Sequence, residues 1–245
     1  MKKILFFLVL FFLSSISFAD EYVLVMSKDD NVCQHMLKLY NEDLRKYGEI
    51  KYDQHEEFNA IKWEEKKYYM MREGKKEYPP SYASNMPALM SRFDINNDGK
   101  EEVVIKTEGM LHGIVTEQLF YFRGKDSAYF NNEEGFDTKI LYDKATGRVG
   151  GGVGFEANGY GLKELPKISI GVVGDKEAYA HYVVGGHFYI DPFIFNGTYY
   201  IDMKDKQLGI RKWLVILKYT KDNQIKDVCY CLEALDCNNK KKRGE

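Results

Sequence analysis

The sequence predicts a mainly β protein of antiparallel sheets with one α-helix near its N-terminus. From residue 88 onward, short runs rich in β-branched and aromatic residues alternate with turn residues. Two junctions, Asn196-Gly197 and the segment 220–224, are typical of tight β-hairpin turns. Apolar residues at helical spacing occur once, near the start of the chain. Together these observations favour packed sheets with a single covering helix.

The first nineteen residues have the features of a secretory signal peptide. A lysine pair precedes an unbroken apolar run over 4–13, and Ser17 and Ala19 supply small residues before the expected cleavage point at Asp20. The run is shorter than the roughly 20 residues that span a bilayer, so we expect no stable membrane insertion after cleavage. We therefore expect a periplasmic or secreted protein.

The expected helix spans about residues 30–47, after a short strand over 21–26. Ser27 or Asp30 can cap its start, and Gly48 ends it. Its apolar positions recur at intervals of three and four residues, as expected for one buried face: Val32, Met36, Leu39, Tyr40 and Leu44.

The rest of the chain is expected to be one mainly β domain, so that the whole domain covers 20–237. Residues 64–82, rich in lysine and tyrosine without clear periodicity, predict a charged loop or an exposed helix. The β-type runs after this segment are 88–93, 102–107, 114–122, 138–143, 168–173, 178–184, 187–195, 198–203, 213–219 and 227–233.

The charge of the chain argues against a nucleic-acid partner. Loss of the signal segment changes the formal charge from −2 to −4, because two lysines leave with it. A phosphate-binding surface needs a clustered basic face. The basic run at 240–243 lies in a polar end, so we expect residues 238–245 to form a disordered basic tail.

All four cysteines lie in the exported part of the chain, where disulfides form and persist. Cys229 and Cys231 are two residues apart in a strand-like run, so they project to the same face and pair poorly with each other. We expect one bridge from Cys33 to Cys229 or Cys231, with Cys237 taking the remaining partner. A zinc site is disfavoured because no histidine accompanies this C-x-C-x5-C spacing.

The stretch RFDINNDGKEEVVI, residues 92–105, has the spacing of a calcium loop. Acidic and amide side chains alternate, and Gly99 permits the sharp turn. Ca²⁺ prefers about six to eight oxygen ligands. The sequence predicts five protein donors, which are the side chains of Asp94, Asn96, Asp98 and Glu102 and the carbonyl of Lys100.

This loop, followed directly by a strand, resembles the calcium loops of FG-GAP/VCBS (integrin-like) repeat proteins over about residues 89–105. The resemblance implies a structural calcium ion and a propeller-blade-like sheet. The sequence contains no second copy of the motif, and an EF-hand is disfavoured because Ile105 occupies the position of the bidentate glutamate. The alternative is an Asx-rich turn that needs no metal.

A glycine-rich segment, Gly147–Gly161, is expected to form a surface loop. Gly152, Gly154 and Ala157 match the dinucleotide fingerprint G-x-G-x-x-A, but no helix follows, so we assign no nucleotide site. This segment is a candidate binding lip or hinge.

No catalytic motif of comparable sharpness accompanies the calcium loop. We therefore expect a noncatalytic, calcium-stabilised binding protein whose partner is a protein or a glycan, with the glycine-rich loop and nearby aromatic residues as the contact surface. The alternative is a secreted hydrolase that acts on a cell-envelope or extracellular polymer. Its site would use carboxylates or the region of His181 and His187.

Overall fold

The chain folds into stacked antiparallel β-sheets covered by helices, which confirms the predicted fold class. The computed structural model describes residues 21–78, 88–111, 114–143, 147–153, 168–173, 180–186, 188–205, 213–221 and 224–234. The expected signal peptide and the expected basic tail lie outside these residues. Within the described part, no helix is long and apolar enough to cross a membrane.

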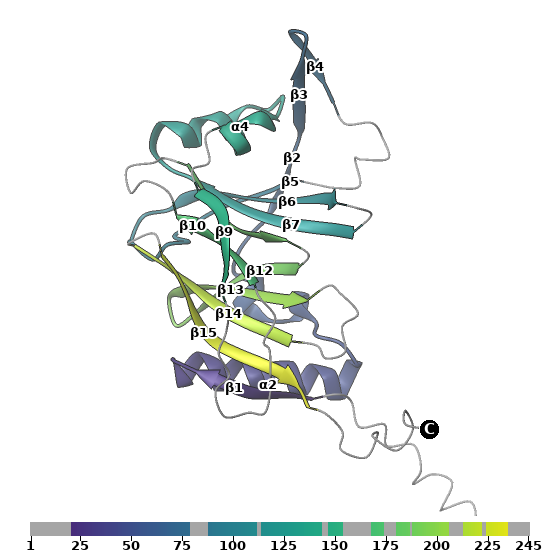
Figure 1. The fold of residues 1–245 in the computed structure, drawn as a ribbon, viewed down its shortest axis with the longest axis vertical. Helices are drawn as coiled ribbons and strands as arrows, with labels where there is room; N and C mark the ends of the chain where they lie inside the picture. The colour runs from purple at the N-terminus through teal and green to yellow at the C-terminus, as the bar shows by residue number, and fades with distance from the viewer. Residues whose placement is uncertain are drawn as a thin grey trace, which may run out of the picture.

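One sheet has five strands in the order β1-β15-β14-β13-β12, and neighbouring strands are antiparallel (Figure 1). Asn196 and Gly197 form the predicted hairpin turn between β12 and β13, with φ values of 49° and 73°. The strands are β1 (Tyr22–Ser27), β12 (Phe188–Phe195), β13 (Thr198–Asp205), β14 (Trp213–Thr220) and β15 (Gln224–Glu233).

The other large sheet has seven strands in the order β2-β5-β6-β7-β11-β10-β9, again with antiparallel neighbours. Residues 147–153 form its edge strand β9, which corrects the expectation of a loop there; pairing with β10 supplies the hydrogen bonds that a glycine-rich strand needs. The strands are β2 (Glu64–Lys66), β5 (Ala88–Phe93), β6 (Glu102–Leu111), β7 (Ile114–Phe122), β9 (Gly147–Val153), β10 (Ile168–Val173) and β11 (Ala180–Gly186).

The segment expected as a charged loop or exposed helix over 64–82 instead contributes strands. Besides β2, it forms a hairpin of β3 (Tyr68–Arg72) and β4 (Lys75–Glu77), which projects from the top of the molecule in Figure 1. The turn residues Glu73 and Gly74 have φ values of 50° and 76°. The hairpin was missed because its exposed faces carry no apolar period.

The N-terminal helix α2 (Asp30–Tyr47) has the predicted bounds. Gly48 ends it in the left-handed conformation with a φ of 75°. The N-cap position is Asp29, one residue before the predicted Asp30, and the Ser27 hydroxyl donates to the Asp30 carboxylate rather than accepting a helix N–H.

The run 138–143, expected as a strand, contains the short helix α4 (Lys139–Asp143). The preceding strand β8 (Phe136–Asp137) pairs in parallel with β3, and Asp137 Oδ1 then accepts the Lys139 N–H at 3.0 Å. Such a local bond from a side chain to the backbone favours a helical turn over a continued strand. The other helical segments are η1 (Tyr52–Gln54), α3 (Glu56–Asn59) and η2 (Gly124–Asn131).

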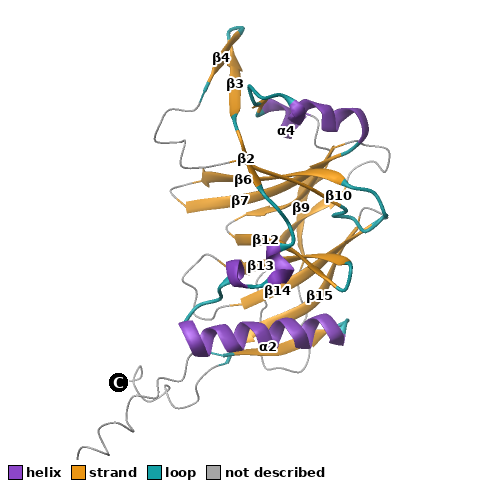
Figure 2. Ribbon diagram, turned by 180° about the vertical axis from the view of Figure 1, so that it is seen from behind, coloured by secondary structure: helices purple, strands orange, loops and turns teal. Residues whose placement is uncertain are grey.

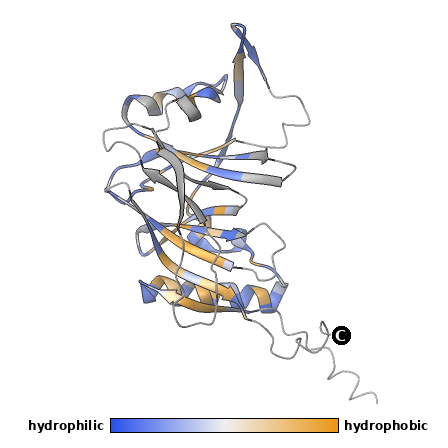
Figure 3. Cartoon of the chain, viewed as in Figure 1, coloured by the Kyte–Doolittle hydropathy of each residue, from blue (hydrophilic) through white to orange (hydrophobic). Residues whose placement is uncertain are grey.

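The two large sheets face each other, and helices cover their outer faces (Figures 1 and 2). On β14, Val215 packs toward the seven-stranded sheet, whereas Leu214 and Ile216 pack against α2. Phe130 of η2 and Leu141 of α4 cover the other side of the seven-stranded sheet. Figure 3 shows hydrophobic residues concentrated on β14, β15 and α2. The two large sheets pack face to face, and the described strands form no propeller among themselves.

A disulfide bond joins Cys33 of α2 to Cys229 of β15, across a sequence separation of 196. This is one of the two pairings that the sequence left open. Cys231 lies on the same face of β15, buried and unbridged, and Cys237, its expected partner, lies outside the described part. The bridge fixes the helix to the sheet that it covers.

Candidate calcium-binding loop and adjacent cavity

A tight loop joins β5 to β6 and contains four of the five predicted calcium donors, and the fifth, Glu102, is the first residue of β6. Asp94 closes the loop, because its Oδ1 accepts the Asp98 N–H at 2.9 Å and its Oδ2 accepts the Gly99 N–H at 2.8 Å. Asn97 and Gly99 have positive φ values of 58° and 90°, which asparagine and glycine adopt most readily. The motif therefore forms the sharp turn that its spacing predicts.

Asn96 and Asp98 extend this network of bonds to loop amides. Asn96 is fully buried, and its Oδ1 accepts the Asp98 N–H at 3.0 Å. Asp98 Oδ1 accepts the Lys100 N–H at 2.9 Å. These bonds are those of the Asx-rich turn that the sequence allowed as an alternative to a metal site. They leave acceptor capacity free, because a carboxylate offers about four lone-pair positions.

Glu102 is buried beside this network, and one of its oxygens is unsatisfied. The residue is 2% exposed, and Oε2 has no hydrogen-bond partner in the described structure. Burial, together with the negative charges of Asp98 and Asp94, raises the pKa of its carboxyl to about 8. The Ile95 amide and the Arg123 charge oppose this shift only in part. An ionised Glu102 would thus be repelled by Asp94 and Asp98 around one end of the loop.

The predicted donors form an open arrangement rather than a closed set of ligands. Lys100 is exposed, and within the described residues no three His, Cys, Asp or Glu side chains are already grouped as metal ligands. A cation at this loop would therefore have to draw Asp94, Asp98 and Glu102 together.

Asn97, which sequence reasoning did not select, connects the loop to the five-stranded sheet. Its Nδ2 donates to the carbonyls of Tyr199 at 3.1 Å and Tyr219 at 2.9 Å, and its Oδ1 accepts the Tyr199 N–H at 2.8 Å. These bonds join a loop of one sheet to two strands of the other. The only sequence signal was an additional asparagine between the alternating donors.

A cavity of about 460 Å³ lies next to the loop. Its wall includes Phe93, the residue before Asp94, and Tyr199, the partner of Asn97. Trp63 completes an aromatic surface, because its ring centroid lies 6.1 Å from that of Phe93, which lies 5.1 Å from that of Tyr199. The size of this cavity lies in the range of ligand sites, and its lining combines aromatic side chains with the charged residues Lys62, Glu64 and Arg92.

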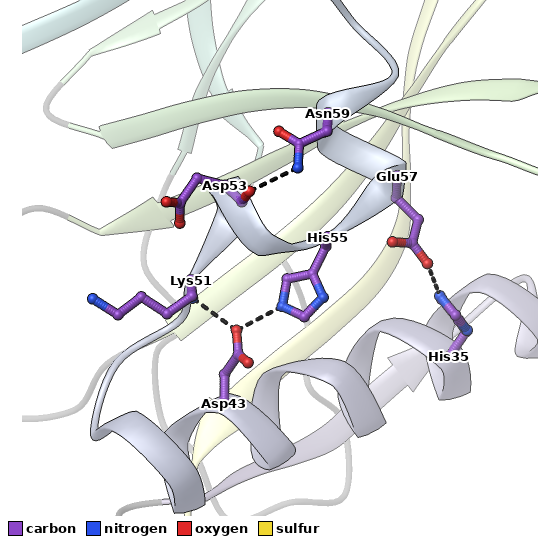
Figure 4. Close-up of polar contacts among 7 residues, drawn as sticks. All are labelled: His35, Asp43, Lys51, Asp53, His55, Glu57 and Asn59. Carbon is purple, nitrogen blue, oxygen red and sulfur yellow. Dashed lines mark hydrogen bonds and ion pairs between the residues drawn. The ribbon is translucent and has the colours of Figure 1, made fainter.

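Histidines near α2 have structural partners. His55 Nε2 lies 2.7 Å from Asp43 Oδ2, which also accepts the Lys51 N–H at 2.7 Å (Figure 4). His35 Nε2 contacts the Glu57 carboxylate in the same view. These contacts fasten the segment that contains η1 and α3 to α2. These polar side chains therefore have structural partners within the protein.

A second polar group links the two large sheets at strand β12. Lys106 Nζ lies 3.0 Å from Glu117 Oε2 and 2.9 Å from Asp191 Oδ1. Glu117 Oε2 also accepts the Ile190 N–H at 2.8 Å. Each charged group has a partner of opposite charge. Lys106 and Glu117 are nearly buried, and a buried charge is costly unless it is paired. We therefore assign this group to holding the sheets together.

Asp202 is a buried acid that forms no ion pair among the described residues. It is 1% exposed and lies opposite Asp191 in the β12–β13 register. Neither carboxyl oxygen has a hydrogen-bond partner in the described part, although the hydroxyls of Tyr52 and Tyr40 lie nearby. Burial raises the pKa of this carboxyl to about 7, and the nearby Tyr52 hydroxyl partly offsets that shift.

The other candidate residues from the sequence have no described site geometry. His181 belongs to β11, but its side chain and the whole of His187 lie outside the described part. The same is true of residues 154–161 in the glycine-rich segment. The part of the hydrolase alternative that uses His181 and His187 therefore lies outside the side chains that the structure describes.

Comparison with protein-family models, with curated proteins and with solved structures found no match for this chain.

Proposed function

We propose that this chain is a noncatalytic, calcium-stabilised binding protein of the periplasm or the extracellular space, whose partner is a protein or a glycan. The observation that carries this proposal is Glu102, a buried carboxyl with an unsatisfied oxygen beside Asp94 and Asp98. An uncompensated buried acid is costly, and a divalent cation removes that cost directly. Oxygen donors of this kind favour Ca²⁺ over softer metals.

The position of the loop supports a structural role for the cation. The loop lies between β5 and β6, and Asn97 bonds it to β13 and β14. A cation that stiffens the loop would also stiffen this junction between the two sheets. The aromatic cavity adjoins the same junction, so the ion would hold a binding surface in place. The Cys33–Cys229 disulfide supports an oxidising compartment.

Thermal unfolding of the metal-free chain from residue 20 onward tests the calcium part of the proposal. We expect millimolar Ca²⁺ to raise the melting temperature relative to chelator, because a ligand that binds only the folded state stabilises it. Glu102→Gln should remove the shift. Glu101→Gln is the matched control, because Glu101 is exposed and adjacent in sequence. Identical melting of the unmodified chain in calcium and in chelator would overturn the proposal.

A further inference from the structure

Strand β5 has an open edge next to the aromatic cavity. β2 pairs with β5 only where Glu64–Lys66 lie opposite Ala88–Met90. Beyond that point, residues 91–93 pair with β6 on one side and have no strand neighbour on the other within the described part. An unpaired edge presents main-chain N–H and C=O groups that can pair with another extended chain.

The cavity lies between this edge and the connection from α3 to β2. Residues 60–64 of that connection line one side of the cavity and residues 90–93 line the other, with Ile194 and Tyr199 between them. Figure 2 shows the connection as the loop that runs from α3, beside the five-stranded sheet, to β2 in the seven-stranded sheet. The two segments thus diverge on the side of residues 60–63, before Glu64, and leave a gap bordered by main chain. An extended ligand fits such a gap better than a compact one.

The aromatic wall provides a place for an apolar side chain of the ligand. Trp63 and Tyr199 are partly exposed, whereas Phe93 between them is 3% exposed. The Trp63 and Phe93 rings meet edge to face. An apolar side chain entering here would contact rings that are already fixed by packing, so little ordering would be needed on binding.

The charges at the rim favour an acidic ligand. Lys62 and Arg92 line the cavity, and neither has an ion pair with a carboxylate in the described part of the chain. Arg92 Nη2 donates instead to the neutral Asn131 side chain at 2.8 Å. The acidic residue of the lining, Glu64, is paired with Lys66 at 3.4 Å. The lining itself therefore has more positive than negative side chains, with Lys62 and Arg92 available to an acidic ligand, whereas the acidic Asp94 and Glu101 lie toward Tyr199.

We propose that the open edge of β5 binds an extended, acidic peptide segment of a partner protein. The peptide adds a strand beside residues 91–93 and places an apolar side chain against Trp63. Main-chain pairing supplies affinity, while the aromatic wall and the two cations select the sequence. This inference rests on the proposed binding function, and it does not require the calcium ion.

Selection of dodecapeptides from a random displayed library on the chain from residue 20 onward tests the inference, with saccharide binding measured in parallel. Fluorescence anisotropy should show that Trp63→Ala binds the selected peptides about tenfold or more weakly than the unmodified chain. Lys62→Glu should weaken binding to a smaller extent that shrinks at high salt. Tyr78→Ala is the matched control, because Tyr78 is also aromatic and 53% exposed but lies outside the lining of this cavity.

Amide hydrogen exchange gives a second readout that does not depend on how Trp63→Ala folds. Peptide should slow exchange in residues 91–93, and N-methylation of the peptide backbone should prevent this. The inference is overturned if no peptide is selected, if both variants bind undiminished, or if only saccharides bind. Peptide binding that persists in chelator, with no thermal effect of calcium, would contradict the calcium proposal alone.

Discussion

The Asn97 side chain forms two hydrogen bonds with the Tyr199 backbone. Its Oδ1 accepts the Tyr199 N–H at 2.8 Å, and its Nδ2 donates to the Tyr199 carbonyl at 3.1 Å. The pair imitates a short piece of β-ladder between a loop of the seven-stranded sheet and β13 of the five-stranded sheet. It places the candidate calcium loop at a junction of the fold, so that the order of the loop and the stability of the junction are coupled.

Asn97→Gly should destabilise the protein by about 3 kcal/mol, because three hydrogen bonds are lost and the Tyr199 N–H is left without its partner. Glycine retains the positive φ of this position, so the loss reports the bonds rather than backbone strain. Urea unfolding measures the change. Asn196→Gly, at a hairpin turn with similarly positive φ, is the control and should change stability little. Equal stabilities of the two variants would contradict a stabilising role for the Asn97 hydrogen bonds.

Asp202 should make the protein less stable as the pH rises from about 4 to about 7. Its folded pKa, about 7, lies above the ordinary value of 3.8. The folded state therefore holds a proton over this range that the unfolded state releases, and stability falls with pH. Asp202→Asn should flatten this part of the profile of unfolding free energy against pH. Asp53→Asn, at an exposed position, should leave the profile unchanged.

Loss of the Cys33–Cys229 bridge should destabilise the fold by about 3 to 5 kcal/mol, because the bond closes a very long loop of the unfolded chain. The double variant Cys33→Ser, Cys229→Ser removes it, and urea unfolding under non-reducing conditions measures the change. Cys231→Ala is the control, since that thiol is buried but unbridged. A reductant should then destabilise the unmodified chain and leave the double variant unaffected. Four free thiols in the unmodified chain would contradict the pairing.

Local sequence patterns were sufficient where a segment forms its structure with nearby residues. The helix over 30–47 follows from its apolar spacing and Gly48, and the β12–β13 turn follows from Asn196-Gly197. The hairpin of β3 and β4 was missed because both faces carry charged or exposed residues. The segment 138–143 has a strand-like apolar run but forms a helical turn, where Asp137 Oδ1 accepts the Lys139 N–H.

The candidate site likewise has parts that depend on neighbouring residues and parts that depend on distant ones. The spacing of Asp94, Asn96 and Asp98 identified the loop, because its bonds connect neighbours in sequence. The role of Asn97 depends on strands about a hundred residues away, with separations of 102 and 122. The open edge at residues 91–93 depends on where β2 stops pairing. Neither feature has a local signature, so only the packed sheets define them.

The most direct test of the calcium proposal is titration calorimetry of Ca²⁺ into the metal-free chain from residue 20 onward, at about pH 7 and about pH 9. We predict one site per chain, with tighter binding at the higher pH because Glu102, whose pKa is about 8, must lose its proton to act as a ligand. Glu102→Gln should abolish the binding heat, and Glu101→Gln should preserve it. No binding at either pH, or undiminished binding by Glu102→Gln, would contradict the proposal.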